Sequence, residues 1–387
     1  MKPPIKICAL TTISKTMDWF IVDSMRNLAK NGYEVTLICD MEDGFKDRNS
    51  DYATCINLPM SRGASLKDLL TVPFKLRKIF KRNKFDAIYY MSPNASMYAA
   101  IGGWLAHIPT RMYVQAGIRY ISFSGISRKI FRFIEKLTCL LSTNIIAVSP
   151  LNMQLAIDEK LCPEQKISII GKGGTIGVSL SECDAFDKQS ERNVKRRKYG
   201  IPEGAFVYGY VGRINTDKGI CELIEAFEKL QTQHSDVWLV LVGMIDEANP
   251  IPDRIMERAK NNAHIIFTGN ISNNQVYQHM AMFDVLTHPT YREGFGKVLQ
   301  EAMGMRLPII TTNVPGPSEV VESNVSGILV EVKNVVQLLE KMLLLYDNEE
   351  LRYSLAEAGR LRAEMYFDRP IMLQNQMDAI NQIINKE

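Results

Sequence analysis

Two glutamates, Glu293 and Glu301, lie eight positions apart on either side of a Gly-Phe-Gly turn. An apolar strand is expected over Phe283–Thr287 before this turn, and a helix over Lys297–Met305 after it. Open α/β sheets bind ligands at such strand–loop–helix junctions. If the intervening residues are mostly helical, the two positions are about 12 Å apart. That distance suits an extended ligand with hydroxyls at both ends and phosphates between them, such as a sugar nucleotide.

A second junction carries two cations. Arg213 and Lys218 follow the predicted strand Phe206–Val211 and precede the predicted helix Ile220–Leu230. Fixed positive charge stabilises a diphosphate leaving group, and Arg and Lys are the side chains that bind phosphate oxygens. Taken singly, each segment could be a solvated loop or a helix start that favours carboxylates. The two segments together favour a binding site.

The segment Glu-Gly-Phe-Gly followed by Glu301 resembles the E-x7-E signature of retaining glycosyltransferases of family 4, which have the GT-B fold. The turn around Arg213 resembles the family's Gly-Arg-x-x-x-x-Lys-Gly motif. This resemblance implies that Glu293 contacts the hydroxyls of the donor sugar and Glu301 those of the ribose. It also implies that Arg213 and Lys218 hold the pyrophosphate. The same resemblance places Glu293, Arg213 and Lys218 in the catalytic step.

Further donor contacts follow from the resemblance. The family binds the nucleotide base at a turn that corresponds to Phe267–Ile271, mainly through backbone near Ile271. The donor-binding backbone around Glu293 would comprise Gly294, Phe295 and Gly296. Val314–Glu319 resembles the family's Gly-Gly-x-x-Glu turn, with Pro317 in place of its second glycine, so the local backbone is expected to differ. A purely structural turn remains an alternative for the first and last of these segments.

The chain departs from the family in its first half. The loop expected at Thr11–Thr16 has no glycine, whereas many members carry a Gly-Gly pair there. Gln115 and Ala116 stand where many members place a histidine near the donor sugar. Whether activity survives that exchange is open. His107 is expected in a surface loop, and His288 either lines the donor pocket or packs structurally.

Length and composition favour two globular domains. The chain has 387 residues, of which 46% are hydrophobic and 23% charged. No signal peptide or membrane-spanning apolar run is expected. Seven scattered cysteines without a C-x-x-C pair indicate reduced thiols in the cytoplasm. No metal is expected, because no Asp-x-Asp triplet is present and the two cations can neutralise the diphosphate.

Apolar strands alternate with helical patterns throughout, which predicts parallel sheets of the α/β class. Ser181–Tyr199 interrupts the alternation and is expected to be a linker that runs into a short helix. The prediction is therefore two Rossmann-like, doubly wound domains that face a cleft in the GT-B manner. Residues 1–190, with a crossover helix over 370–387, would bind the acceptor, and residues 191–369 the nucleotide-sugar donor. The predicted helices and strands are the following: strands Ile5–Leu10, Glu34–Cys39, Phe85–Tyr90, Thr110–Gln115, Asn144–Val148, Lys166–Ile170, Phe206–Val211, Val237–Val242, His264–Thr268, Asp284–Thr287, Pro308–Thr311 and Gly327–Val330; and, in the first half, helices Asp18–Lys30, Ser65–Arg82, Ala95–Leu105, Ser127–Leu141 and Leu151–Glu159.

Charge is divided unevenly between the halves. Residues 1–190 contain 25 Lys and Arg against 17 Asp and Glu, and the remainder contains 21 against 26. Lys75–Lys84 and Arg128–Ile134 mix basic and apolar residues at helical spacing, which is typical of segments that lie on an anionic membrane surface. Each could instead be a surface helix whose apolar stripe faces its own core. No nucleic-acid-binding motif is recognisable.

The resemblance implies a hexosyltransferase (EC 2.4.1.-) on the inner face of the plasma membrane. It would move a hexose or N-acetylhexosamine from a UDP-sugar to an undecaprenyl-diphosphate-linked saccharide, in assembly of capsule, O-antigen or related glycans. Two alternatives stay open: a UDP-N-acetylglucosamine 2-epimerase-like enzyme and a non-catalytic sugar-nucleotide-binding protein. The sequence identifies neither the sugar, the acceptor and linkage, nor the oligomeric state.

Overall fold

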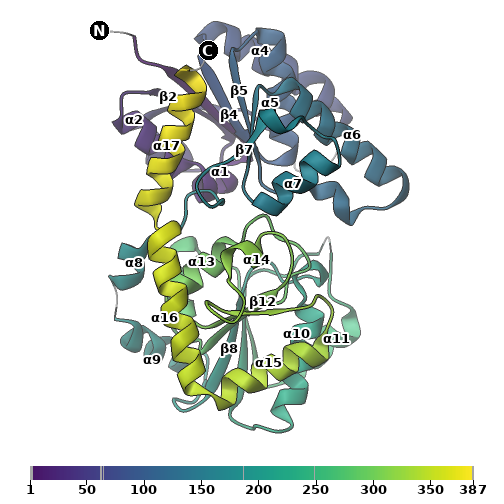
Figure 1. Ribbon diagram of the computed structural model, residues 1–387, viewed down its shortest axis with the longest axis vertical. Coiled ribbons are helices and arrows are strands. Elements are labelled where there is room, and N and C mark those ends of the chain that lie inside the picture. Colours follow the sequence, from purple (N-terminus) through teal and green to yellow (C-terminus); the bar gives the residue numbers. More distant parts are fainter. Residues whose placement is uncertain (1–2, 62, 64, 186, 248, 386–387) are drawn as a thin grey trace. The chain divides into compact units, whose positions relative to one another are not determined.

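The structure, a computed structural model, describes residues 3–61, 63, 65–185, 187–247 and 249–385. The chain forms two compact units (Figure 1). Unit 1 comprises Met1–Ile176 and Pro370–Glu387, and unit 2 comprises Gly177–Arg369. Each unit is a parallel sheet with helical crossovers, as the alternation of apolar strands and amphipathic helices predicts.

Within the described residues, unit 1 contains a seven-stranded parallel sheet in the order β3-β2-β1-β4-β5-β6-β7. Its central strands are almost wholly buried, because helices cover both faces of a parallel sheet. The strands are β1 (Lys6–Ile13), β2 (Glu34–Asp40), β3 (Ala53–Asn57), β4 (Ala87–Met91), β5 (Thr110–Gln115), β6 (Asn144–Ala147) and β7 (Ile167–Ile169). The helices are α1 (Ser14–Phe20), α2 (Val22–Lys30), α3 (Phe45–Asn49), α4 (Leu66–Asn83), α5 (Pro93–Ala106), α6 (Gly125–Leu141), α7 (Pro150–Asp158) and α17 (Arg369–Asn385).

Helix α17 returns to unit 1 from the other end of the sequence. Tyr33 Oη donates to Asn381 Oδ1 at 2.5 Å, and Ser24 donates to the buried amide of Gln376. In Figure 1 this yellow helix runs beside α2. Residues that are more than 340 positions apart therefore share one core.

Unit 2 contains, within the described residues, a six-stranded parallel sheet in the order β10-β9-β8-β11-β12-β13. The chain builds outward from β8 to β10, and then returns to the other side of β8 with β11. Strands β8 and β11 thus flank the point where the strand order reverses, which is where open α/β sheets bind ligands. The strands are β8 (Phe206–Val211), β9 (Val237–Val242), β10 (Ile265–Gly269), β11 (Val285–His288), β12 (Ile309–Thr312) and β13 (Ile328–Val330). The helices are α8 (Leu180–Asp184), α9 (Lys188–Lys198), α10 (Ile220–Gln231), α11 (Asp253–Asn261), α12 (Val276–Met280), α13 (Lys297–Gly304), α14 (Pro317–Val320), α15 (Val335–Asp347) and α16 (Glu349–Tyr366).

The predicted strands lie within two residues of the observed ones, except the first. The expected loop Thr11–Thr16 was wrong, because β1 continues to Ile13 and α1 begins at Ser14. The expected helix Asp18–Lys30 was also wrong in its start and continuity. The helical segment begins four residues earlier, at Ser14. It is interrupted at Ile21, because the φ of −131° at this residue lies outside the helical range although its ψ of −38° is helical.

Of the expected linker and short helix over Ser181–Tyr199, the helix is confirmed as α9, whereas the expectation of a linker before it was wrong. Most of these residues belong to α8 and α9, which are part of unit 2. Arg196 of α9 is only 2% exposed and donates to the carbonyls of Met282 and Ala205 and to the carboxylate of Asp284. The basic run looked solvated in the sequence because its buried partners lie far along the chain.

Among the described residues, no helix combines the length and the apolar character that crossing a membrane requires.

Candidate functional site

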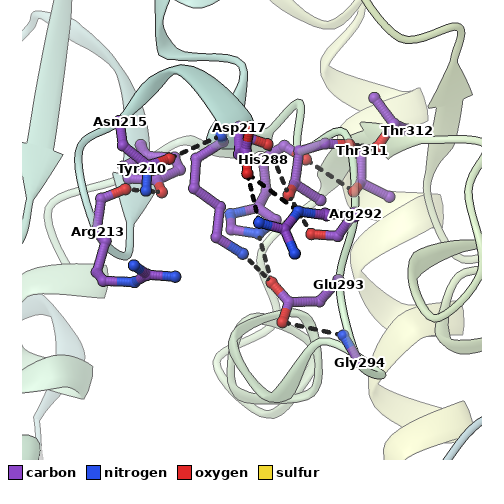
Figure 2. Close-up of polar contacts among 12 residues, drawn as sticks. Tyr210, Arg213, Asn215, Asp217, His288, Arg292, Glu293, Gly294, Thr311 and Thr312 are labelled. Atoms are coloured by element: carbon purple, nitrogen blue, oxygen red, sulfur yellow. Dashed lines mark hydrogen bonds and ion pairs between the residues drawn. The ribbon is translucent and has the colours of Figure 1, made fainter. Parts of the chain in front are cut away.

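The site is built from two loops of unit 2 that leave neighbouring strands. The first loop follows β8 and carries Arg213 and Lys218, and the second follows β11 and carries Glu293. Strands β8 and β11 pair in parallel, with Tyr208 opposite Val285, so their carboxyl ends emerge at the same edge. Figure 2 shows Arg213 and Glu293 at this edge.

The first loop is held by its own polar side chains. Asn215 is 2% exposed, and its side-chain oxygen accepts the backbone N–H of Lys218 at 3.0 Å. Tyr210 is fully buried in β8, and its hydroxyl donates to the carbonyl of Arg213 at 2.8 Å. Gly219 ends the turn at φ +68°, a conformation that favours glycine.

Gly219 also lets the second loop approach. A Cβ atom at this position would lie 1.9 Å from the carbonyl oxygen of Pro289. Across this close contact, the backbone N–H of Tyr291 donates to the carbonyl of Asp217 at 2.8 Å. The carboxylate of Asp217 accepts from the guanidinium of Arg292 at 2.6 Å. The two loops therefore form one rigid platform.

Lys218 and Glu293 meet on this platform. The ammonium of Lys218 contacts Glu293 Oε2, and the side chains are 13% and 26% exposed, respectively. Burial alone would raise the pKa of Glu293, but the charge of Lys218 and the neighbouring His288 outweigh it and hold the pKa well below its usual range. Glu293 is thus an ionised acceptor that still reaches solvent.

His288 ends β11 beneath this pair. Its ring lies flat against that of Tyr210, with centroids 5.3 Å apart and planes 9° apart. Its Nε2 atom is 3.6 Å from Glu293 Oε2. Burial lowers the pKa of His288, against the opposing effect of Glu293, so the ring is neutral. The ring is thus packed against Tyr210 and lies beside the Lys218–Glu293 pair.

Arg213 stands apart from the Lys218–Glu293 pair. Its guanidinium is 61% exposed and binds Asp246 Oδ2 at 2.5 Å. Asp246 follows β9, and the same oxygen accepts from Asn215 Nδ2 at 2.9 Å. Asp246 thereby contacts two side chains in the first part of the loop, a role that nothing in its sequence context signals.

The second loop ends where α13 begins. Gly296 has φ +98° and precedes Lys297, the first residue of α13, so the positive end of the helix dipole lies beside Gly294, Phe295 and Gly296. The segment between the two glutamates begins as a loop, Gly294 to Gly296, and continues as the first turn of α13. Glu301 lies within α13, 12% exposed, and pairs with Lys297 at 3.4 Å.

The turn over Val314–Glu319 packs under the second loop. A Cβ atom on Gly316 would lie 3.0 Å from the carbonyl oxygen of Gly294 and 3.1 Å from that of Glu293. The N–H of Gly316 donates to the carboxylate of Glu319 at 2.8 Å. Pro317 opens α14, a position whose missing N–H costs nothing.

Ile271 lies two residues beyond the end of β10, at the same edge of the sheet. The N–H of Gly243, which follows β9, donates to the carbonyl of Gly269 at 3.1 Å and ties these two loops together. Met244 and Ile245 are 54% and 38% exposed there. Ile271 follows β10 and the first loop follows β8, and strand β9 lies between these two strands in the sheet.

Gln115, one of the two residues expected where many family members place a histidine, makes a structural contact within unit 1. Its amide donates to Glu135 Oε1 at 2.7 Å, and the Tyr113 hydroxyl donates to the same atom at 2.9 Å. Burial raises the pKa of Glu135, and these two hydrogen bonds oppose the rise. Gln115 therefore anchors α6 to β5, while Ala116 is exposed. His107 is exposed at the end of α5, as expected.

Within the part of the chain that the structure describes, no group of three or more His, Cys, Asp or Glu side chains could hold a metal ion.

Two Rossmann-like parallel-sheet units are the fold of the GT-B class, which solved glycosyltransferase structures share with this chain. Residues 18–173 match the model of Glycosyltransferase Family 4, and residues 191–362 match that of Glycosyl transferases group 1. Both halves of the chain thus match models of glycosyltransferase domains.

Three particular proteins resemble the chain over most of its length. The Capsular polysaccharide biosynthesis glycosyltransferase CapM of Staphylococcus aureus is 29% identical over 383 residues, which are 98% of each chain. The UDP-Gal:alpha-D-GlcNAc-diphosphoundecaprenol alpha-1,3-galactosyltransferase of Escherichia coli is 23% identical over 84% of this chain and 83% of its own. The crystal structure of Anabaena Alr3699/HepE in complex with UDP and glucose has a TM-score of 0.80 at 19% identity, and covers 97% of this chain and 99% of its own.

Proposed function

We propose that this chain is a retaining hexosyltransferase that moves a hexose or N-acetylhexosamine from a UDP-sugar to an undecaprenyl-diphosphate-linked saccharide. The observation that carries the proposal is the Lys218–Glu293 pair, which sets a cation and an ionised acceptor side by side at the strand-order reversal. The names of the S. aureus and E. coli relatives support capsule or related glycan assembly and a lipid-linked acceptor.

The two cations would bind the donor diphosphate. Arg213 offers a largely exposed planar guanidinium, and Lys218 offers a movable ammonium on a flexible stem. As the bond from the sugar to the diphosphate breaks, negative charge grows on the leaving oxygen, and preorganised cations stabilise it. On this proposal no metal is needed.

The carboxylates would bind the donor at its two ends. Glu293 is ionised, so it can accept hydrogen bonds from the sugar hydroxyls, while Gly294, Phe295 and Gly296 bring backbone close to the ligand. Glu301 would accept from the ribose hydroxyls. The loop around Ile271 would contact the base.

Retention would follow from attack on the same face that the diphosphate leaves. The acceptor oxygen forms its bond to the anomeric carbon as the bond to the diphosphate breaks, and the proton of the acceptor passes to the leaving phosphate oxygen. The enzyme then supplies positioning and charge stabilisation rather than a protein nucleophile.

Unit 1 offers a surface suited to the membrane that holds such an acceptor. On α4, Leu66, Leu70 and Phe74 form an exposed stripe at four-residue spacing. On α6, Ile126, Ile130 and Phe133 form another. Both helices pack against α5, where Gly102 admits the side chain of Leu76 from α4. We name these two stripes the apolar face.

Exposed cations accompany the apolar face, which suits an anionic lipid surface. Lys67 and Lys78 lie on α4, and Lys129 and Lys136 lie on α6. The proposed location is therefore the inner face of the plasma membrane, where nucleotide sugars and lipid-linked saccharides meet.

The test of transfer is incorporation of label from a panel of radiolabelled UDP- and GDP-sugars into a lipid extract of host membranes. Label entering the lipid from one UDP-sugar, with the anomeric configuration of the donor kept in the product, is the expected result. Label that stays in a nucleotide-linked epimer, or donor that binds without turnover, would overturn the proposal.

The test of the apolar face is co-sedimentation with vesicles of phosphatidylglycerol and phosphatidylcholine. Leu70→Asp should weaken binding strongly. Leu361→Asp is the matched control, because Leu70 is 62% and Leu361 61% exposed, and Leu361 lies on α16 of unit 2. Equal loss in both variants, or none in either, would refute the assignment of the face.

A further inference from the structure

His288 carries two buried nitrogen atoms that have no hydrogen-bond partner among the described residues. The side chain is 2% exposed. Buried polar atoms in folded proteins nearly always have a partner, and exceptions call for an explanation. Stacking on Tyr210 accounts for the orientation of the ring, but it leaves the nitrogen atoms unexplained.

The carboxylate of Glu293 is surrounded by more donors than it uses. Its Oε1 atom accepts the N–H of Gly294 at 3.2 Å, and its Oε2 atom contacts the ammonium of Lys218. His288 Nε2 points at the same Oε2 atom from 3.6 Å, beyond hydrogen-bonding distance. The ammonium of Lys218 and the Nε2 atom of His288 thus both face Glu293 Oε2, and Lys218 makes the contact.

The two competitors differ in mobility. Lys218 ends a short 3-10 helix, Thr216–Lys218, and its mobility lies in the flexible four-carbon stem of its side chain. His288 is held in β11, buried and stacked, with room for little more than a small shift. A diphosphate beside Arg213 would attract the ammonium of Lys218, and Glu293 would then lose the cation that balances its charge.

We propose that His288 is a positioning residue that takes over Glu293 Oε2 when Lys218 turns to the donor diphosphate; this inference rests on the proposed function. The move requires the Nε2–Oε2 distance to shorten by about 0.6 Å, to the common N–H···O distance near 3.0 Å. His288 would keep the carboxylate oriented and hydrogen-bonded while it receives the sugar hydroxyls. The neutral ring must carry its proton on Nε2 to do this.

The first test observes the histidine ring itself. Long-range ¹H–¹⁵N spectra of the protein labelled at its five histidines, with His288→Gln used for assignment, report the tautomer and the Nε2–H shift. We expect His288 to carry its proton on Nε2, and UDP to move that proton signal downfield as the hydrogen bond shortens. In Lys218→Met the downfield signal should be present without UDP.

The possible results distinguish a failure of the proposed function from a failure of the inference about His288. If calorimetry detects no UDP binding, the proposed function fails, whereas the Lys218→Met spectrum still tests His288. If UDP binds but the His288 signals of the wild-type protein stay fixed, or if Lys218→Met leaves them unchanged, the inference about His288 is overturned.

The second test separates positioning from packing. His288→Phe keeps a ring on Tyr210 and removes the donor, so kcat should fall roughly tenfold or more while the Kd for UDP stays within about twofold. His288→Gln, which restores an N–H donor, should recover part of kcat. His264→Phe is the control, because His264 is also stacked, on Trp238 at 4.5 Å, in the same unit. Equal kcat in His288→Phe and the wild type would refute the role.

Discussion

Gly219→Ala is expected to separate the two loops of the site. The added Cβ atom would lie 1.9 Å from the carbonyl oxygen of Pro289, a distance that real Cβ contacts do not reach. The residue would also keep φ +68°, which an L side chain rarely adopts. Strain of about 1–2 kcal/mol from the left-handed backbone and about 1–3 kcal/mol from overpacking together predict a loss of about 2–5 kcal/mol in unfolding free energy.

The catalytic effect should exceed the effect on stability. Relief of the contact requires about 1 Å of separation between the loops, and misplacement of that size costs on the order of 10²-fold in rate. The separation would strain the Tyr291–Asp217 backbone bond and the Arg292–Asp217 ion pair, and it would draw Lys218 away from Glu293.

Gly200→Ala is the matched control. Gly200 has φ +69°, almost the same as Gly219, but a Cβ atom there meets nothing within 4 Å. It should lose only about 1–2 kcal/mol of unfolding free energy and retain full activity. The assays are urea unfolding of both variants, and transfer from the donor that the labelling panel identifies. Equal losses of stability and activity in the two variants would refute the close packing of the loops.

Three further predictions follow from the same contacts. Lys218→Met should lower kcat/KM by about 10²–10³-fold in steady-state transfer, because one preorganised donor to the leaving group is lost; a value near that of the wild type would refute its role. Because the folded-state pKa of Glu293 is depressed below its ordinary value of 4.5, its contribution to stability is present above that pH and is lost as pH falls below it. The difference in urea midpoint between wild type and Glu293→Gln should therefore be constant from about pH 6 to 8 and shrink below about pH 4.5, and a pH-independent difference would contradict this. Arg196→Met should cost about 3–5 kcal/mol of unfolding free energy, because the buried carbonyls of Ala205 and Met282 lose their donor and Asp284 loses one of its two cations; a loss below 1 kcal/mol in urea unfolding would show that α9 is not anchored as described.

The local sequence pattern predicted most helices and strands. It failed where the residues of an element are only partly buried or where their contacts are distant in the sequence. Most strands of both sheets are short apolar runs bounded by turn residues, and such runs form strands in most tertiary surroundings. β3 was missed because its residues are half exposed at the edge of the sheet, so its pattern is weak. The burial of Arg196 in α9 was not predicted, because two of its partners, Met282 and Asp284, are 86 and 88 positions away.

The sequence by itself determined which charged residues follow the strands at the candidate site. Residue type and local spacing placed Arg213, Lys218 and Glu293 after strands, and the family motifs implied their roles. It also determined that each half is a parallel α/β sheet, because hydrophobic periodicity is a local property of the chain.

Only the tertiary structure decided which of these groups meet. Lys218 contacts Glu293 across 75 positions because β8 and β11 are neighbours at the strand-order reversal, and no local pattern encodes strand order. The same arrangement put His288 beneath the pair and Asp246 beside Arg213. The sequence context of Asp246 carries no signal of a site. The roles of both residues depend on distances of a few ångströms between loops, which are set by packing and by the room that Gly219 leaves for Pro289.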